Sequence, residues 1–192
     1  MTLEFRPHFE KIIELLVYLA HKKPGADKYQ AVKFFYLADR EHLNRYGRPI
    51  TFEKYYALPY GPVASNAKDI IEGDSWTMRA ANLSDLPIRM ETKPGRGPDS
   101  RDIVVLAEAL RDVDYDVFSK SDIRVFDEII DTYGDMSFDD LFRITHDHAA
   151  YVNAWARRGG SRRAEMDYSE MIESEEMREK VQSDIAPIAA HV

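Results

Sequence analysis

Two histidines stand two positions apart in the stretch His146-Asp147-His148, the closest approach to a cluster of metal ligands in the chain. Residues two apart on a helix point about 200° apart, so both rings cannot easily bind one ion. Helical spacing also places His146 near the apolar stripe, one turn after Phe142 and about one turn before Ala149. We therefore expect a structural, hydrogen-bonded histidine at position 146 and no metal site.

A second group of reactive side chains, Asp39, Glu41 and His42, lies within one expected helix. Carboxylates and imidazole are the usual general acids and bases of enzymes. Charged residues of an amphipathic helix normally form its solvent-facing side, so we interpret these three as a solvated face with local ion pairs. A small hydrolase or transferase would instead bring them together with His146 in one pocket.

Aromatic side chains are concentrated around an arginine and a Gly-Pro turn. The residues concerned are Tyr46, Arg48, Tyr55, Tyr56, Pro59 and Tyr60. Tyrosine and arginine are typical anchors of protein interfaces, and an ordered turn would hold them rigid. The same rings could equally cover the end of the core, with each hydroxyl group hydrogen-bonded. Both interpretations fit the sequence.

Composition excludes several classes of protein. The chain has 192 residues, 44% of them hydrophobic, which is enough for one sizeable core. It contains no cysteine, so disulfides and thiolate metal sites are excluded, and a reducing cytoplasm is the expected location. The longest apolar run, residues 15–20, is far shorter than the roughly 20 residues that span a bilayer. We expect no membrane contact and see no nucleotide-binding, hydrolase or zinc-protease motif.

Charge argues against generic nucleic-acid binding. Lys and Arg number 26 against 34 Asp and Glu, which gives a net charge of -8. Such a field repels polyanions, so DNA binding would need a local basic patch. It also steers an acidic protein toward a basic partner.

Helical elements begin at clear capping signals. The apolar period predicts a first helix from Phe9 that ends at Lys22-Lys23-Pro24-Gly25. Capping boxes predict further helices at residues 27–47, 119–134 and 137–155; their residue pairs are Asp27 with Gln30, Ser119 with Asp122, and Ser137 with Asp140. A shorter helix is expected to start at Pro62 and to end at Gly73.

Strands are expected near Tyr55 and at residues 86–92 and 102–106, the last two joined by a mobile Gly- and Pro-rich loop around Gly95. The predicted fold class is α+β and mainly helical. It is a single globular domain of five to six helices, with one small antiparallel sheet of two or three strands formed by these segments. The domain covers residues 1–158, and residues 159–192 form an acidic C-terminal segment, either a short helix or a loose tail.

The order of these elements approximates a winged helix, which makes a DNA-binding autoregulator the alternative function. The third helix would then enter a groove, and the loop with Arg96 and Arg101 would be the wing. Only Lys68 is basic in that helix, against Asp69 and Glu72. The charge of the helix therefore disfavours DNA recognition, except for possible operator DNA.

Three blocks carry a family resemblance: residues 33–43 (KFFYLADREHL), 46–51 (YGRPIT) and 55–63 (YYALPYGPV). In order and spacing they resemble the Panacea domain, the SocA-like antitoxin family. Further along, Leu141, Thr145-His146 and Trp155 resemble the closing helix of that domain, so the likeness covers roughly residues 29–155.

The resemblance implies an antitoxin of a bacterial or phage toxin-antitoxin pair, which is not an enzyme, needs no cofactor and neutralises a toxin encoded beside it by direct contact. In one branch of the family the antitoxin also delivers its toxin to an ATP-dependent protease. The positions interpreted as framework are Asp39, Arg40, Gly47, Pro49, Gly61, Pro62 and His146. Gly47 is expected to form a left-handed helix cap. The candidates for toxin contact are Arg48, Tyr56 and Tyr60, followed by Tyr46 and His42.

Overall fold

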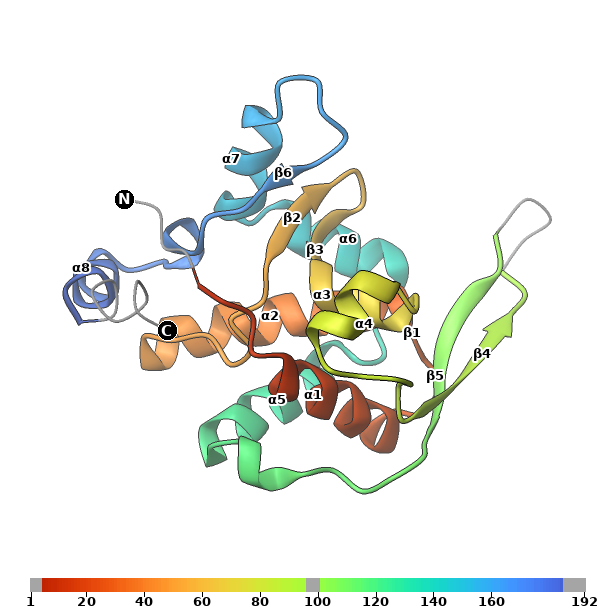
Figure 1. Ribbon diagram of the computed structural model, residues 1–192. Helices are drawn as coiled ribbons and strands as arrows, with labels where there is room; N and C mark the ends of the chain where they lie inside the picture. The colour runs from red at the N-terminus through yellow and green to blue at the C-terminus, as the bar shows by residue number, and fades with distance from the viewer. Residues whose placement is uncertain (1–4, 96–100, 185–192) are drawn as a thin grey trace.

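The fold is built around one central helix. The computed structural model describes residues 5–95 and 101–184. Helix α2 (Lys28–Tyr46) begins at the predicted capping box of Asp27 and Gln30 and ends at Gly47, whose φ of 77° is the expected left-handed cap. Because α2 packs against other elements on most sides, it is buried along much of its length and passes through the middle of the molecule (Figure 1).

Two helices cover one side of α2. Helix α1 (Phe9–Lys22) is buried over its whole central part, as its apolar sequence predicts. Helix α5 (Lys120–Tyr133) starts at the predicted capping box of Ser119 and Asp122 and packs against α2. The short η1 (Tyr115–Val117) precedes α5, and Phe126 of α5 is in edge contact with Phe35 of α2. Buried apolar side chains of α1, α2 and α5 belong to one hydrophobic core.

A small sheet covers the other side of α2. Strands β2 (Tyr55–Leu58) and β3 (Gly61–Ala64) form an antiparallel hairpin, and β6 (Ala164–Glu165) pairs with the free edge of β2. Side chains alternate along β2, so that Tyr55 and Ala57 are buried while Tyr56 is only partly covered. The hairpin therefore places its connecting turn close to the helices that pack on it.

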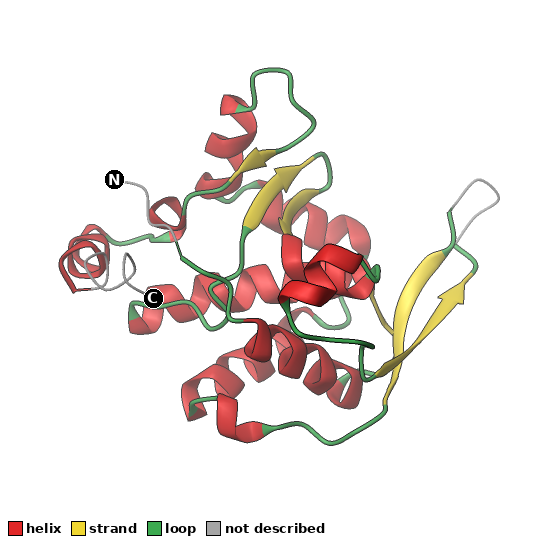
Figure 2. Cartoon of the chain, viewed as in Figure 1, coloured by secondary structure: helices red, strands yellow, loops and turns green. Residues whose placement is uncertain are grey.

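A second sheet forms the projecting edge of the molecule. It consists of β1 (Ala26–Asp27), β5 (Ile103–Ala109) and β4 (Ile88–Lys93), in that order and all antiparallel. The expectation of one sheet joining the segment near Tyr55 to this ribbon is wrong, because β5 takes β1 as its partner and β2 pairs with β3 and β6. Figure 2 shows the two strand groups apart from each other. Most of the connecting loop, including Arg96, lies outside the described residues.

The start of the third helix was predicted at the wrong residue. Pro62 lies inside β3, opposite Ala57, and helix α3 (Ser65–Ile71) begins three residues later. The N-terminal N–H groups of α3 are capped by the buried carboxylate of Glu53, which accepts hydrogen bonds from the backbones of Asn66 (3.0 Å) and Ala67 (2.9 Å). A distant side chain therefore supplies the cap that the local sequence lacks. Helix α4 (Ser75–Ala80) follows.

The long helix expected from Ser137 is two helices. Helix α6 (Phe138–His146) begins at the predicted capping box of Ser137 and Asp140, and α7 (Ala149–Arg157) follows after two residues. At the end of α6 the hydroxyl of Thr145 donates to the carbonyl of Leu141 at 2.8 Å. Such side-chain bonds to the helix backbone compete with continuation of the helix.

Residues 159–184, the described part of the C-terminal segment, pack against the rest of the chain. Besides β6, the chain continues into η2 (Tyr168–Met171) and α8 (Glu175–Asp184). Tyr168, Met171 and Ile172 are buried in the core, and the Tyr168 hydroxyl donates to the carbonyl of Glu53 at 2.7 Å. These residues extend the sheet and the core of the predicted domain, and α8 is the short helix expected in this segment, whereas the boundary after residue 158 stays a prediction.

The predicted class is confirmed, since the fold is α+β and mainly helical. The described residues contain eight α-helices instead of five or six, because α4, α7 and α8 were not separated in the sequence. Within the described part of the chain, no helix combines the length and apolar character that crossing a membrane requires.

Candidate functional site

The turn between β2 and β3 is held by side chains from three helices. Lys33 of α2 donates from its Nζ to the carbonyl of Tyr60 at 2.7 Å and to that of Pro62 at 2.8 Å. Tyr151 of α7 donates to the carbonyl of Leu58 at 2.9 Å. Backbone carbonyls of a turn normally bond to water, so these contacts fix a segment that would otherwise be mobile.

His146 of α6 is the third contact with this turn. Its Nε2 lies 3.3 Å from the carbonyl of Pro59, and its Nδ1 lies 2.7 Å from that of Phe142. The imidazole is stacked on the ring of Phe142 at 3.6 Å and meets the edge of Tyr151 at 4.4 Å. His146 is hydrogen-bonded, as predicted, and its structural role stays a prediction that these contacts support. His148 faces elsewhere, with Nδ1 3.1 Å from the hydroxyl of Tyr36.

Gly61 is required in this turn for two reasons. Its φ of +96° is a conformation that side chains with a Cβ rarely adopt. A Cβ at this position would also lie 2.6 Å from Nζ of Lys33 and 3.0 Å from Cε1 of His146. The glycine allows the turn to approach the lysine closely enough for the two carbonyl bonds.

Lys33 is an unusual centre for such a site because its side chain is completely buried. Its ammonium group lies 4.8 Å from the ring centroid of Tyr29 and takes no carboxylate partner among the described residues. Burial lowers the pKa of Lys33 to about 7. Burial also raises the pKa of Tyr29, whose hydroxyl has no hydrogen-bond partner within the described chain.

Aromatic rings are exposed beside this turn. The side chain of Tyr60 is 65% exposed and that of Phe138, at the start of α6, is 48% exposed. Their centroids are 6.1 Å apart in edge contact, and Phe138 also lies 4.3 Å from Tyr29 and 6.1 Å from Phe142. We call Tyr29, Tyr60, Phe138 and Phe142 the aromatic patch. Sequence reasoning missed Phe138, although Phe138, Phe142 and His146 are spaced at i, i+4 and i+8 on one helix face.

The expected solvated face of α2 is wrong for two of its three residues. Asp39 and His42 have no exposed surface, whereas Glu41 forms the expected local ion pair with Arg45 at 2.6 Å. The four reactive side chains, including His146, have different partners and do not meet in a pocket. These four side chains therefore do not form an acid and base pair with one another.

Asp39 anchors the segment that follows α2. One carboxylate oxygen accepts from the backbone N–H groups of Ile50 (2.8 Å) and Thr51 (2.9 Å). The other accepts from the hydroxyls of Thr51 (2.5 Å), Tyr55 (2.9 Å) and Tyr168 (3.3 Å). Burial raises the pKa of Asp39, and these hydrogen bonds oppose the rise. A side chain with this many internal partners acts as framework, as its match to the family motif implies.

His42 and Arg48 join α2 to the start of α5. The ring nitrogens of His42 lie 2.8 Å from the carbonyl of Arg48 and 3.2 Å from the carboxylate of Asp122. The Arg48 guanidinium donates to the same carboxylate at 2.8 Å, and Lys11 donates to it at 2.6 Å. Burial alone would raise the pKa of Asp122. Hydrogen bonds from His42 and Lys11 outweigh burial and hold this pKa well below its usual range.

The remaining predicted residues lie in different places. Tyr46 is 43% exposed and accepts a hydrogen bond from Arg124 at 3.0 Å. It lies thirteen residues after Lys33 on α2, which is a distance of roughly 20 Å along the helix. Tyr56 lies under the guanidinium of Arg163, 4.7 Å from its ring centroid. Arg40 is paired with Glu173, and the carbonyl of Pro49 accepts from Arg48. Of the five contact candidates, Tyr60 is the one that lies in the turn itself, with its carbonyl bound by Lys33; we call the segment 58–62, with its carbonyls bound by Lys33, His146 and Tyr151, the clamped turn.

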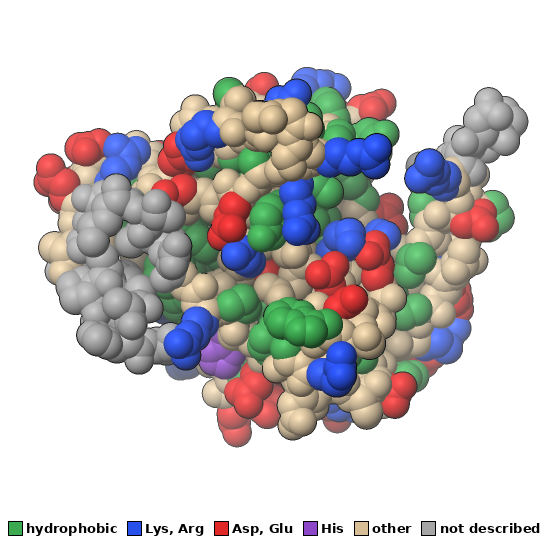
Figure 3. Space-filling view, turned by 45° about the horizontal axis from the view of Figure 1, so that its top comes forward, with side chains coloured by type: hydrophobic (Ala, Val, Ile, Leu, Met, Phe, Trp, Pro, Cys, Tyr) green, Lys and Arg blue, Asp and Glu red, His purple; other side chains and the backbone are tan. Residues whose placement is uncertain are grey.

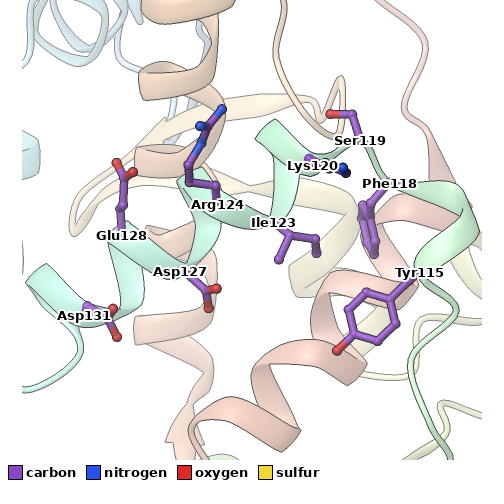
Figure 4. Close-up of a pocket in the computed structure, with 9 residues that line it drawn as sticks. All are labelled: Tyr115, Phe118, Ser119, Lys120, Ile123, Arg124, Asp127, Glu128 and Asp131. Carbon is purple, nitrogen blue, oxygen red and sulfur yellow. The ribbon is translucent and has the colours of Figure 1, made fainter.

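Three features of the described residues bear on the DNA-binding and enzyme alternatives. Lys68 of α3 is paired with Glu72 at 2.6 Å and with Asp69 at 3.2 Å, so its charge is already compensated. A hollow of about 500 Å³ lies between η1 and α5, with Tyr115, Phe118 and Ile123 on its apolar side (Figure 4). Its Asp127 already accepts a hydrogen bond from Tyr18 at 2.6 Å. No cluster of side chains in the described chain could hold a metal ion.

Fold and site together define a class of protein. It is a mainly helical α+β domain in which side chains of α2, α6 and α7 bind the backbone of the β2–β3 turn that carries Tyr60. Residues 32–151 match the model of the family described as antitoxin SocA-like, Panacea domain. The match covers more than half of the chain, and the chain belongs to this family. No curated protein and no solved structure shows a significant match to it.

Proposed function

We propose that this protein is an antitoxin that neutralises a toxin protein, encoded beside it, by direct contact. Membership of the SocA-like Panacea family supports an antitoxin role. The location of the contact site is supported by one observation: the ring of Tyr60 is exposed on a turn whose carbonyls are bound by side chains of three helices. The proposed role is that of a binding protein and not of an enzyme.

The clamped turn suits a binding role because its order is established before the partner arrives. Association loses free energy whenever flexible side chains and loops become fixed in the complex. Lys33, His146 and Tyr151 already fix the backbone beneath Tyr60. Affinity of protein complexes is concentrated in a few aromatic and arginine anchors, so Tyr60 and Phe138 are the proposed anchors that cover the toxin's active surface.

The predicted contact residues are divided accordingly. His42 has no exposed surface and Arg48 is bound to Asp122 and Ser119, so we reassign both to the framework that shapes the domain. Tyr46 and Tyr56 are accessible in part, but Tyr46 contacts Arg124 and Tyr56, on β2, lies under Arg163. Delivery of the toxin to an ATP-dependent protease, and binding of operator DNA, stay predictions.

The experiment expresses the neighbouring reading frame alone and together with this chain, and scores growth and co-purification. The proposal expects that the neighbour stops growth alone and that this chain restores growth while purifying with it. The double variant Tyr60→Ala/Phe138→Ala should lose rescue. Trp76→Ala is the matched control, because Trp76 is 69% exposed on α4 and belongs to another element than the aromatic patch. A harmless neighbour, or full rescue by the double variant, contradicts the proposal.

A further inference from the structure

Arginines are concentrated in the loop between α7 and β6 of an otherwise acidic chain. Residues 157–163 read RRGGSRR, whereas the whole chain has a net charge of -8. Gly159 and Gly160 have φ values of +57° and +85°, which turn the backbone sharply at the surface. Figure 3, which brings the top of the molecule forward, shows Lys and Arg side chains gathered around this loop.

Three of these arginines lack a carboxylate partner in the part of the chain that the structure describes. Arg157 is the exception, because it forms a bidentate ion pair with Glu170 at 2.7 and 2.9 Å. Arg158 instead lies over the ring of Trp155, 4.1 Å from its centroid, and Arg163 lies over Tyr56. Arg162 is exposed. We call Arg158, Arg162 and Arg163 the arginine loop.

Ring contacts connect the arginine loop to the aromatic patch. Trp155 is stacked with Tyr151 at 6.1 Å, and Tyr151 meets His146 at 4.4 Å. His146 in turn is stacked on Phe142 of the patch. The arginine loop and the exposed ring of Tyr60 are therefore joined by one series of aromatic contacts along α6 and α7.

The two stacked guanidinium groups are prepared for planar anions. Arg158 donates one Nη–H to the carbonyl of Trp155 at 2.8 Å, which leaves its other N–H groups for a ligand. Among the described residues the Arg163 guanidinium is held only by the ring of Tyr56, so its N–H edge can form bidentate bonds to a carboxylate. A long polyanion such as nucleic acid would feel the repulsion of the whole acidic chain, whereas a short acidic segment meets mainly the local positive charge. The chemistry favours a protein segment rich in Asp and Glu.

We propose that the arginine loop binds an acidic segment of the toxin that the aromatic patch contacts. The assignment of this segment to the toxin rests on the proposed function. The binding of carboxylates by the loop does not depend on it. An acidic antitoxin thereby recognises carboxylates at one end of its binding surface. The sequence prediction did not identify this site, because its boundary after residue 158 separated Arg158 from Arg162 and Arg163 and placed the last two in a segment that is acidic as a whole.

The test compares the wild-type full-length chain with the variant Arg158→Glu/Arg162→Glu/Arg163→Glu. A second triple variant, Arg79→Glu/Arg101→Glu/Lys120→Glu, is the matched control, since it makes the same charge change on exposed residues elsewhere. Each chain is titrated with a fluorescent peptide of ten glutamates, with a ten-nucleotide single-stranded RNA, and with the co-expressed toxin. Circular dichroism and melting curves check that all three chains are folded.

Wild type and control are expected to bind the peptide in a salt-sensitive manner, and the loop variant to bind it and the toxin at least about tenfold more weakly. Failure of the wild type to bind the peptide, or equal binding by all three chains, overturns the assignment. RNA bound more tightly than the peptide also overturns it. Peptide binding without any toxin interaction supports the loop chemistry but contradicts the proposed function. If the chain binds the toxin and the loop variant binds it equally well, the proposed function is supported and the assignment of the loop to the toxin is overturned.

Discussion

The ammonium group of Lys33 donates a 2.7 Å hydrogen bond to the backbone carbonyl of Tyr60, so a fully buried side chain of the central helix fixes the base of a largely exposed ring. Lys33 also bonds the carbonyl of Pro62. One amine thus holds both ends of the turn around Gly61. The backbone of the exposed turn is therefore held in one conformation by a side chain of the core.

Lys33 makes the stability of the domain depend on pH in a defined window. Its pKa is about 7 in the folded protein against an ordinary value of 10.5. Between these values the unfolded chain binds more protons, so the free energy of unfolding rises with pH. The gain approaches about 1.4 kcal/mol per pH unit at most. Urea unfolding at pH 7, 8 and 9 should show this rise for the wild type and a flatter profile for Lys33→Met.

Lys120→Met is the control for that measurement, because Lys120 is exposed at the start of α5. Its pH profile should run parallel to that of the wild type. If the wild type and Lys33→Met have parallel profiles instead, the amine is charged throughout the window and the argument from burial fails.

Gly61→Ala should destabilise the domain more than Gly73→Ala. Both glycines have positive φ values, +96° and +70°, so each substitution carries a conformational cost of about 1–2 kcal/mol. At Gly73 no atom lies within 4 Å of the added Cβ, whereas at Gly61 the nearest atom is Nζ of Lys33 at 2.6 Å. The difference between the two unfolding free energies measures the close approach of the turn to Lys33. Equal losses would show that the turn can move away at no cost.

Local signals in the sequence predicted the helices, whereas long-range contacts determined the site. A capping box involves residues three apart, and the three expected boxes all form. Asp39 and His42 instead take their partners from the segments around Thr51 and Asp122, which no local pattern connects to α2. Their burial therefore could not be predicted from helical periodicity.

Long-range contacts also account for the wrong expectations around the hairpin. Pro62 is a good first residue of a helix by its fixed φ, yet pairing with Ala57 keeps it in β3. The cap of α3 comes from Glu53, which is more than ten residues earlier. Tyr60 could be singled out from its position in a Gly-Pro turn, but the lysine that holds the turn belongs to another element.

Tyr60→Ala should weaken toxin binding by about 1–3 kcal/mol while changing the free energy of unfolding by less than about 0.5 kcal/mol. The ring is largely exposed, so its removal leaves the core intact. Calorimetric titration with the toxin and urea unfolding give the two values. Tyr60→Phe should retain most of the affinity if the ring face makes the contact. A loss of stability as large as the loss of affinity would indicate a structural role instead.

Truncation after residue 158 should prevent cooperative folding. It removes β6 and the buried side chains of Met166, Tyr168, Met171 and Ile172. Full burial of a large apolar side chain contributes about 1.5–3 kcal/mol, so the sum is comparable to the roughly 5–15 kcal/mol that stabilises a whole domain. Truncation after residue 174 is the control, because it keeps these four side chains. It removes α8 and with it the buried side chain of Val181. Thermal unfolding followed by circular dichroism should show a sharp transition for the longer fragment and none for the shorter one. A sharp transition for residues 1–158 would confirm the domain boundary that composition alone suggested.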